Sequence, residues 1–279
     1  MFRIEELLDL FRDDTEVIKI ILSSYLLSQR ENKELSDSVF QQLLFLKQIQ
    51  PNIHIKINYK SSENSNYNPN ENIIYLNGYF DETTFFHELT HLFSYCYSKF
   101  EIPQEYKDFK KKFHSSQMNH SRIISFLNLC KAEKQKNIKN AVPLELEKNE
   151  INQNLSNNDL QSNNDYFIIC KIEDIIDSIY GGESHDHGLM YLKDNNSYLQ
   201  KAPRSAGHGC DYFNKNGYDF EEIIADYQAI KMLAPNNQIF ILLKQILGNK
   251  FVAFLEDRCE IINGKKVFGL DSNNNIIKK

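Results

Sequence analysis

The chain has 279 residues, and its 32 basic and 38 acidic side chains give a net charge of −6. That length accommodates one large domain or two small ones. Hydrophobic residues make up 41% and charged residues 25%, which is typical of a globular protein and excludes disordered and collagen-like chains. The acidic balance disfavours a general nucleic-acid binder, so no nucleic-acid partner is expected.

The cysteines and the start of the chain indicate its compartment. The five cysteines are scattered and form no Cys-x-x-Cys pair, so we expect reduced thiols that hold neither metal nor disulfide. The chain begins Met-Phe-Arg-Ile-Glu-Glu, which is unlike a secretory signal. No stretch reaches the ~18 uncharged apolar residues of a membrane span. We therefore expect a cytoplasmic protein, or one secreted by a leaderless route, with no membrane partner.

Hydrophobic periodicity predicts helices first and strands next. Residues 3–49 carry apolar side chains at helical spacing, so we predict an N-terminal helical subdomain over 1–50, ended by Pro51. Residues 53–59 then alternate between apolar and polar, which predicts a half-buried strand. A second short strand is predicted at 73–76.

Helices dominate the rest of the chain, 51–279, which we treat as a second domain. A stretch rich in Asn, Gln, Lys and Glu at 135–165 cannot bury enough apolar surface to offset chain entropy, so we predict a flexible insertion. Residues 183–218 are rich in glycine and histidine and predict an irregular, site-forming segment. The predicted helices cover 82–98, 118–134, 172–179, 220–233, 236–247 and 249–258.

One short motif carries chemistry. The segment 84–93 contains His87 and His91 four residues apart, so a helix places both imidazoles on one face. Glu88 lies beside them, near enough to address a water on a shared metal ion. A hydrolytic zinc site needs this geometry: two neutral imidazoles hold Zn²⁺, the ion lowers the pKa of water toward ~7, and a carboxylate accepts the proton. The alternative is an amphipathic core helix with these three residues at its polar edge.

This segment resembles the active-site helix of the zincin metallopeptidases, including the uncharged and bulky neighbours of the motif. The resemblance implies an α+β fold that is mostly helical, with a small sheet before the active-site helix whose edge strand aligns the substrate. The strands at 53–59 and 73–76 are the candidates for that sheet. The resemblance also implies one Zn²⁺ per chain and a third ligand outside the matched segment.

The third ligand places the resemblance in the gluzincin branch. Metzincins have a glycine and a third histidine after the motif, where this chain has serine and tyrosine. Gluzincins instead take a glutamate from a later helix with an acidic residue four positions on, which here implies Glu222 as ligand. Asp226 would then accept the free N–H of a ligating imidazole, that of His87. The small residue before the second acid, Ala225, also resembles the third-ligand helix of anthrax lethal factor-like peptidases. Glu221 is the neighbouring alternative for the ligand.

Histidines and tyrosines gather in the segment between the two helices. His185, His187 and His208 each adjoin or lie near glycine, in a layout that resembles zincin-like proteins of phage and bacterial-effector origin. A tyrosine stabilises the oxyanion in lethal factor-like enzymes, so the resemblance implies Tyr212 or Tyr218 in that role, with His208 assisting. His185 and His187 would contact substrate or bind a second ion. The alternative for each histidine is an ordinary polar loop residue.

We therefore predict a zinc-dependent endopeptidase acting on a protein or peptide substrate, with His87, His91 and Glu222 as ligands and Glu88 as general base. Residues 51–279 would be its catalytic domain. A leaderless, acidic chain of this kind would suit a bacterial effector or toxin. Two alternatives stay open: a zincin-like binding or assembly module with structural or no zinc, for instance in a phage particle, and a metal-dependent hydrolase of something other than peptides.

Overall fold

The computed structural model describes most of the chain from residue 53 onward. The described residues are 42, 46, 53–58, 60–77, 82–97, 102–138, 157–193, 198–215, 218–262, 268–270 and 276–278. Gln42 and Leu46 are helical and buried. The rest of the predicted N-terminal helical subdomain, with its boundary near residue 50, lies outside the described residues.

The chain divides into two compact units, each built from segments that are distant in sequence. The first unit comprises 1–101, 224–237 and 249–279, and the second comprises 102–223 and 238–248. Helices predominate among the described residues, and a small sheet is present, so the predicted class, α+β and mostly helical, is confirmed at that level.

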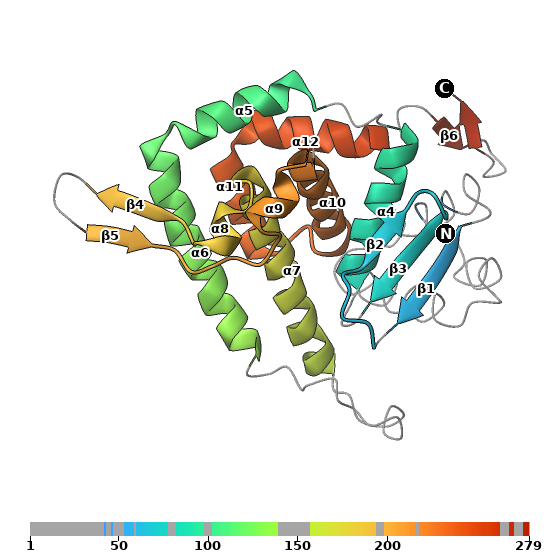
Figure 1. Ribbon diagram of the computed structural model, residues 1–279, viewed down its shortest axis with the longest axis horizontal. Coiled ribbons are helices and arrows are strands. Elements are labelled where there is room, and N and C mark those ends of the chain that lie inside the picture. Colours follow the sequence, from blue (N-terminus) through green and yellow to red (C-terminus); the bar gives the residue numbers. More distant parts are fainter. Residues whose placement is uncertain are drawn as a thin grey trace. The chain divides into compact units, whose positions relative to one another are not determined.

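The sheet of the first unit confirms both predicted strands. It contains β1 (His54–Asn58), β2 (Asn66–Asn68) and β3 (Ile73–Asn77). Strand β3 lies in the middle, parallel to β1 and antiparallel to β2 (Figure 1). Its apolar side chains are buried, whereas β1 alternates between exposed and half-buried residues as the period-two pattern predicts.

Helix α4 (Glu82–Tyr97) packs on this sheet and confirms the predicted helix at 82–98. It contacts β2 and β3, and also α12 (Asn249–Ile262). Five of its apolar side chains are fully buried, as expected for residues that recur at helical spacing. They are Phe85, Phe86, Leu89, Leu92 and Phe93. The unit also holds the C-terminal part of α10 (Tyr218–Leu233) and a hairpin of β6 (Phe268–Leu270) and β7 (Ile276–Lys278).

The second unit is built around a pair of long helices. Helices α6 (Gln117–Ile138) and α7 (Asn157–Ile179) pack against each other, and α11 (Gln238–Leu247) contacts both. The remaining elements are α5 (Gln104–His114), α8 (Glu183–Asp186), β4 (Met190–Lys193), β5 (Tyr198–Lys201), α9 (Cys210–Phe213) and the start of α10.

Helix covers both ends of the stretch predicted as a flexible insertion. Helix α6 runs to Ile138 and α7 begins at Asn157, so these two ends are helical rather than irregular; residues 139–156 lie outside the described part, and the flexible insertion stays a prediction. Once an apolar segment has nucleated a helix, each added polar residue gains a backbone hydrogen bond, which extends the helix beyond its apolar stripe. The segment 183–218, predicted as irregular, holds α8, the β4–β5 hairpin and α9.

Within the described residues, no single helix has both the length and the apolar composition to cross a membrane. Helices α11 and α12 meet that test only when taken together across a sharp bend.

Candidate metal centre

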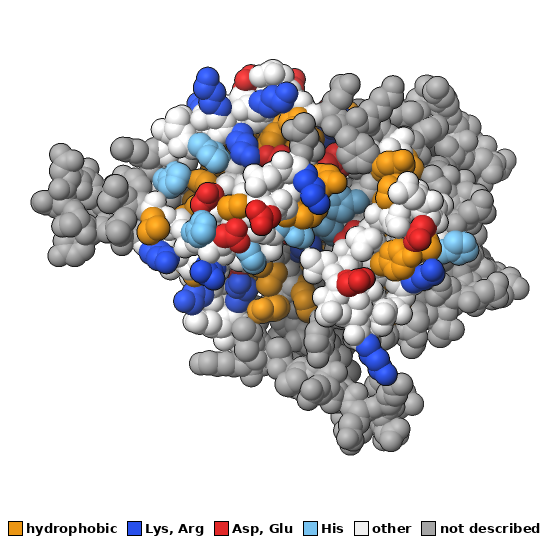
Figure 2. All heavy atoms as spheres, in the orientation of Figure 1, with side chains coloured by type: hydrophobic (Ala, Val, Ile, Leu, Met, Phe, Trp, Pro, Cys, Tyr) orange, Lys and Arg blue, Asp and Glu red, His pale blue; other side chains and the backbone are white. Residues whose placement is uncertain are grey.

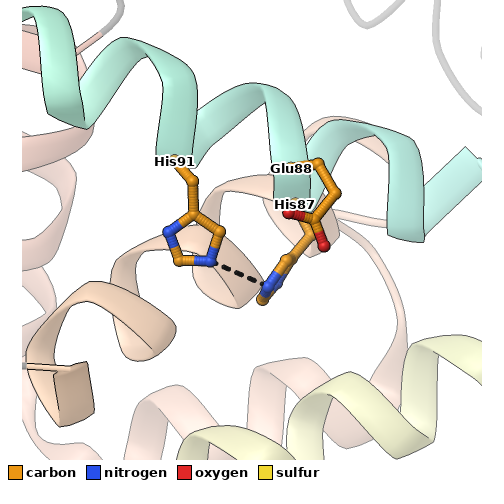
Figure 3. Close-up of side chains that lie close together, drawn as sticks. All are labelled: His87, Glu88 and His91. Carbon is orange, nitrogen blue, oxygen red and sulfur yellow. Dashed lines mark hydrogen bonds between the residues drawn. The ribbon is translucent and has the colours of Figure 1, made fainter. Parts of the chain in front are cut away.

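Helix α4 brings His87, Glu88 and His91 together. The two histidines project from one face of the helix, as the four-residue spacing predicts, and their Nε2 atoms lie 3.0 Å apart (Figure 3). His87 is 4% exposed and Glu88 5%, whereas His91 is half-buried. One donor atom from each residue lies within 4.8 Å of the others. The motif therefore forms a compact donor group of two buried residues and one that is half-buried.

A buried carboxylate fixes the orientation of His87. Its Nδ1 lies 2.5 Å from Oδ1 of Asp226, which belongs to the α10 part of the same unit. Asp226 is 0% exposed. An ionised carboxylate only accepts hydrogen bonds, so Nδ1 of His87 carries the proton and Nε2 keeps its lone pair. This pairing is the one predicted from the sequence, and it turns the lone pair toward His91.

The donors fit a zinc ion. Zinc–imidazole bonds are ~2.0–2.1 Å long, so two imidazole nitrogens on a tetrahedral ion lie ~3.3 Å apart. The Nε2 atoms of His87 and His91, 3.0 Å apart, need only a small separation to reach that value. Hydrogen bonding of the other imidazole nitrogen to a carboxylate is the usual support for a zinc-bound histidine. Two imidazoles and an adjacent carboxylate can thus bind a divalent cation and exchange a proton beside it.

Glu222 lies in the second unit, at the start of α10, and is 2% exposed. Its Oε1 accepts a 2.5 Å hydrogen bond from the Tyr212 hydroxyl, and its Oε2 lies 3.6 Å from Nε2 of His208. Asp174, His208 and Glu222 bring donor atoms within 4.8 Å of one another. The structure therefore groups Glu222 with two of the predicted catalytic residues. Its role as the third ligand to His87 and His91 stays a prediction.

The two predicted oxyanion donors differ in their surroundings. The Tyr212 ring stacks on His208 at 4.1 Å between centroids, and its hydroxyl is directed to Glu222. Tyr218, the first residue of α10, is 38% exposed, and its ring lies 5.4 Å from that of Tyr212. Tyr212 is thus hydrogen-bonded to a buried carboxylate, whereas Tyr218 lies beside the Tyr212 ring and is partly exposed to solvent. Glu221, the alternative ligand, is half-buried on the same helix.

Sequence reasoning missed the buried acids of α7. Asp177 is 0% exposed, and its Oδ1 accepts the His185 backbone N–H at 2.7 Å. Burial raises the pKa of Asp177 to about 7, against the lowering effect of that hydrogen bond. Gly207 leaves room for this carboxylate, since a Cβ there would lie 2.7 Å from oxygens of both Asp174 and Asp177. The sequence did contain a signal for their burial: these acids lie among closely spaced isoleucines, and a solvent-exposed helix face would not carry so many apolar residues.

No known protein family, curated protein or solved structure matches this chain.

Proposed function

We propose that the chain is a zinc-dependent hydrolase of peptide bonds, of the gluzincin kind. The observation that carries this proposal is the convergence of the His87 and His91 Nε2 atoms on a helix whose Glu88 lies beside them. The buried carboxylate of Asp226 behind His87 supports it, because such carboxylates orient metal-binding imidazoles and raise their basicity.

Each residue has a defined role in this proposal. His87, His91 and the predicted third ligand Glu222 hold one ion. When bound, Zn²⁺ supplies Lewis acidity, which acidifies water and polarises a carbonyl. The Glu88 carboxylate accepts a proton from the attacking water and delivers it to the leaving amine. A tyrosine hydroxyl, that of Tyr212 or Tyr218 with His208 assisting, stabilises the oxyanion.

The sheet supports a peptide as substrate. Strands β1 and β2 form the two edges of the described sheet, and α4 packs against the same sheet. An extended peptide can add to a sheet edge through backbone hydrogen bonds, which position a chain irrespective of its side chains. We therefore propose an endopeptidase that takes a protein or peptide segment in extended form, and a bacterial effector or toxin as its biological setting.

The test combines metal content with cleavage of a broad peptide library. Glu88→Gln should retain zinc and lower cleavage by at least ~100-fold, because the substitution removes the proton acceptor and leaves both imidazoles. His91→Ala should lose the ion of the α4 site together with the activity. The exposed residue Glu63 supplies a matched control, since Glu63→Gln makes the same change of residue type outside α4 and outside the two edge strands.

Unchanged cleavage by the Glu88→Gln protein would contradict the proposed mechanism, in which Glu88 is the general base. A wild-type chain that binds zinc and cleaves no library peptide would favour the binding or assembly module. Equal zinc content in wild type and His91→Ala would overturn the ligand assignment.

A further inference from the structure

A second group of donors lies in the second unit, where α8 meets α9. Glu183 begins α8 and His187 follows its end, so the two are four positions apart and share one face. Cys210 begins α9. One ligand atom from each of these residues lies within 4.8 Å of the others. Figure 2 shows histidine and acidic side chains gathered at the surface over these two short helices.

The backbone holds these donors together through two glycines. Gly182 has a φ of +90°, and a Cβ there would lie 2.3 Å from the Cys210 nitrogen, so only glycine permits this approach. A Cβ on Gly209 would lie 2.7 Å from an Asp186 oxygen. Asp186 in turn accepts the Cys210 backbone N–H at 2.8 Å. These contacts fix the main-chain approach of α8 and α9, from which the three donor side chains extend.

The donors are accessible to solvent to different degrees, and the Asp186 carboxylate also interacts with the Cys210 thiol. Glu183 and His187 are exposed, and Cys210 is half-buried. The thiol of Cys210 is free of any disulfide. An ion could therefore enter from solvent, and binding would release the thiol proton as the sulfur becomes a ligand.

The donor types select the ion. A thiolate, an imidazole and a carboxylate are all zinc ligands, whereas Mg²⁺ and Ca²⁺ take oxygen ligands almost alone. Donor atoms on a tetrahedral zinc lie ~3.3–3.7 Å apart, which side-chain rotation can reach from separations within 4.8 Å. We propose that Glu183, His187 and Cys210 form a second zinc site, with a fourth position open to solvent.

This site would tie α8 to α9. Helix α9 carries Tyr212, whose hydroxyl is bonded to Glu222, so an ion at Cys210 would hold that hydrogen bond in place. The expectation from the sequence that all five cysteines are free of metal would then be wrong for Cys210. The site requires nothing of His87 and His91, so it can be tested separately from the α4 site, although it would steady two residues of the proposed hydrolase, Tyr212 and Glu222.

Cobalt(II) titration of the full chain distinguishes the two sites. The Glu183–His187–Cys210 site contains a thiolate and the α4 site does not, so only the former gives a sulfur-to-cobalt charge-transfer band in the near ultraviolet. Wild type should bind two equivalents and show the band. Cys210→Ser should bind one equivalent of cobalt and show no charge-transfer band. His91→Ala should also bind one equivalent but should still show the band. Cys170→Ser, at another half-buried cysteine of the same unit, is the control.

The variant His187→Ala separates loss of a ligand from misfolding, because it changes an exposed position. It should weaken cobalt binding while the far-ultraviolet circular dichroism spectrum stays unchanged. A band that persists in Cys210→Ser would overturn the proposal. So would a wild-type chain that shows no thiolate band at saturating cobalt.

Discussion

At the scale of single residues, Asp226 is the most informative side chain of the described structure. It lies inside the unit at 0% exposure, and the 2.5 Å contact to His87 uses one of its oxygens. A carboxylate is costly to bury unless it is paired, so its position is explained by a partner that gains from it. A histidine that must present one lone pair outward is such a partner.

Asp226→Asn should therefore weaken zinc binding at α4 by ~10–100-fold while the fold is retained. The amide keeps the shape of the carboxylate but holds the imidazole N–H less strongly. Competition with a chromophoric chelator measures the affinity, and Asp108→Asn at an exposed position of α5 provides the control. Wild-type affinity in Asp226→Asn would mean that His87 does not depend on this carboxylate for its orientation.

At the scale of elements, three helices of the second unit meet at one aromatic ring. Tyr180, just after α7, stacks on His114 of α5 at 4.7 Å and meets the His120 ring of α6 edge-on at 5.2 Å. His114 also donates from Nε2 to the Ile179 carbonyl at 2.7 Å, which satisfies a carbonyl at the end of α7. The three helices are thus joined by uncharged imidazoles.

Acidification should loosen this junction. Desolvation lowers the pKa of His114 and of His120 below the ordinary 6.5. Above pH 6.5 both imidazoles are mainly neutral in the folded and in the unfolded chain. Below pH 6.5 the unfolded chain binds protons more readily than the folded chain, so the free energy of unfolding falls. Asp177, whose pKa is raised to about 7, contributes with the opposite sign over the same pH range, so the histidine effect is measured as a difference between two proteins. Between about pH 7.5 and about pH 5.5, the urea midpoint of the double variant His114→Gln, His120→Gln should fall less, or rise more, than that of wild type. The same change in both proteins would contradict the assignment.

Elements with a single dominant pattern were predictable from the sequence, and others were not. Strands β1 and β3 and helix α4 follow their apolar periodicity closely. Helix α5 was not predicted, because charged residues occupy most of the surface of this helix and only Tyr106 and Phe113 are buried, which is too few for a clear apolar stripe. The β4–β5 hairpin was also missed, since it depends on pairing between strands rather than on local pattern. Burial of Asp177 depends on Gly207, which is distant in sequence.

At the scale of the whole molecule, the boundary between the two units falls within α10. Its first residues, including Glu222, belong to the second unit, and its later residues, including Asp226, belong to the first. The sequence placed these two acids on one helical face, and the continuous helix retains that relation. The four-residue spacing of the two acids is visible in the local sequence. Their side-chain partners could not be predicted in the same way, because they come from segments that are distant in the sequence.

Zinc content tests whether Glu222 completes the α4 site. In a Cys210→Ser background, which removes the other proposed site, Glu222→Ala should reduce bound zinc from one equivalent toward none, because two imidazoles alone bind the ion weakly. Glu221→Ala in the same background should leave the content unchanged. Loss of the ion from Glu221→Ala alone would transfer the ligand role to that residue.

The order of the strands has a consequence for how the sheet assembles. Strands β2 and β3 pair through Asn68 and Ile73, five positions apart, whereas β1 joins β3 through His54 and Ile73, nineteen positions apart (73 − 54). Closing the shorter loop loses less chain entropy, so the β2–β3 ribbon should form early and β1 should dock last. One of the two edge strands of the described sheet, β1, is then the strand whose attachment is completed last.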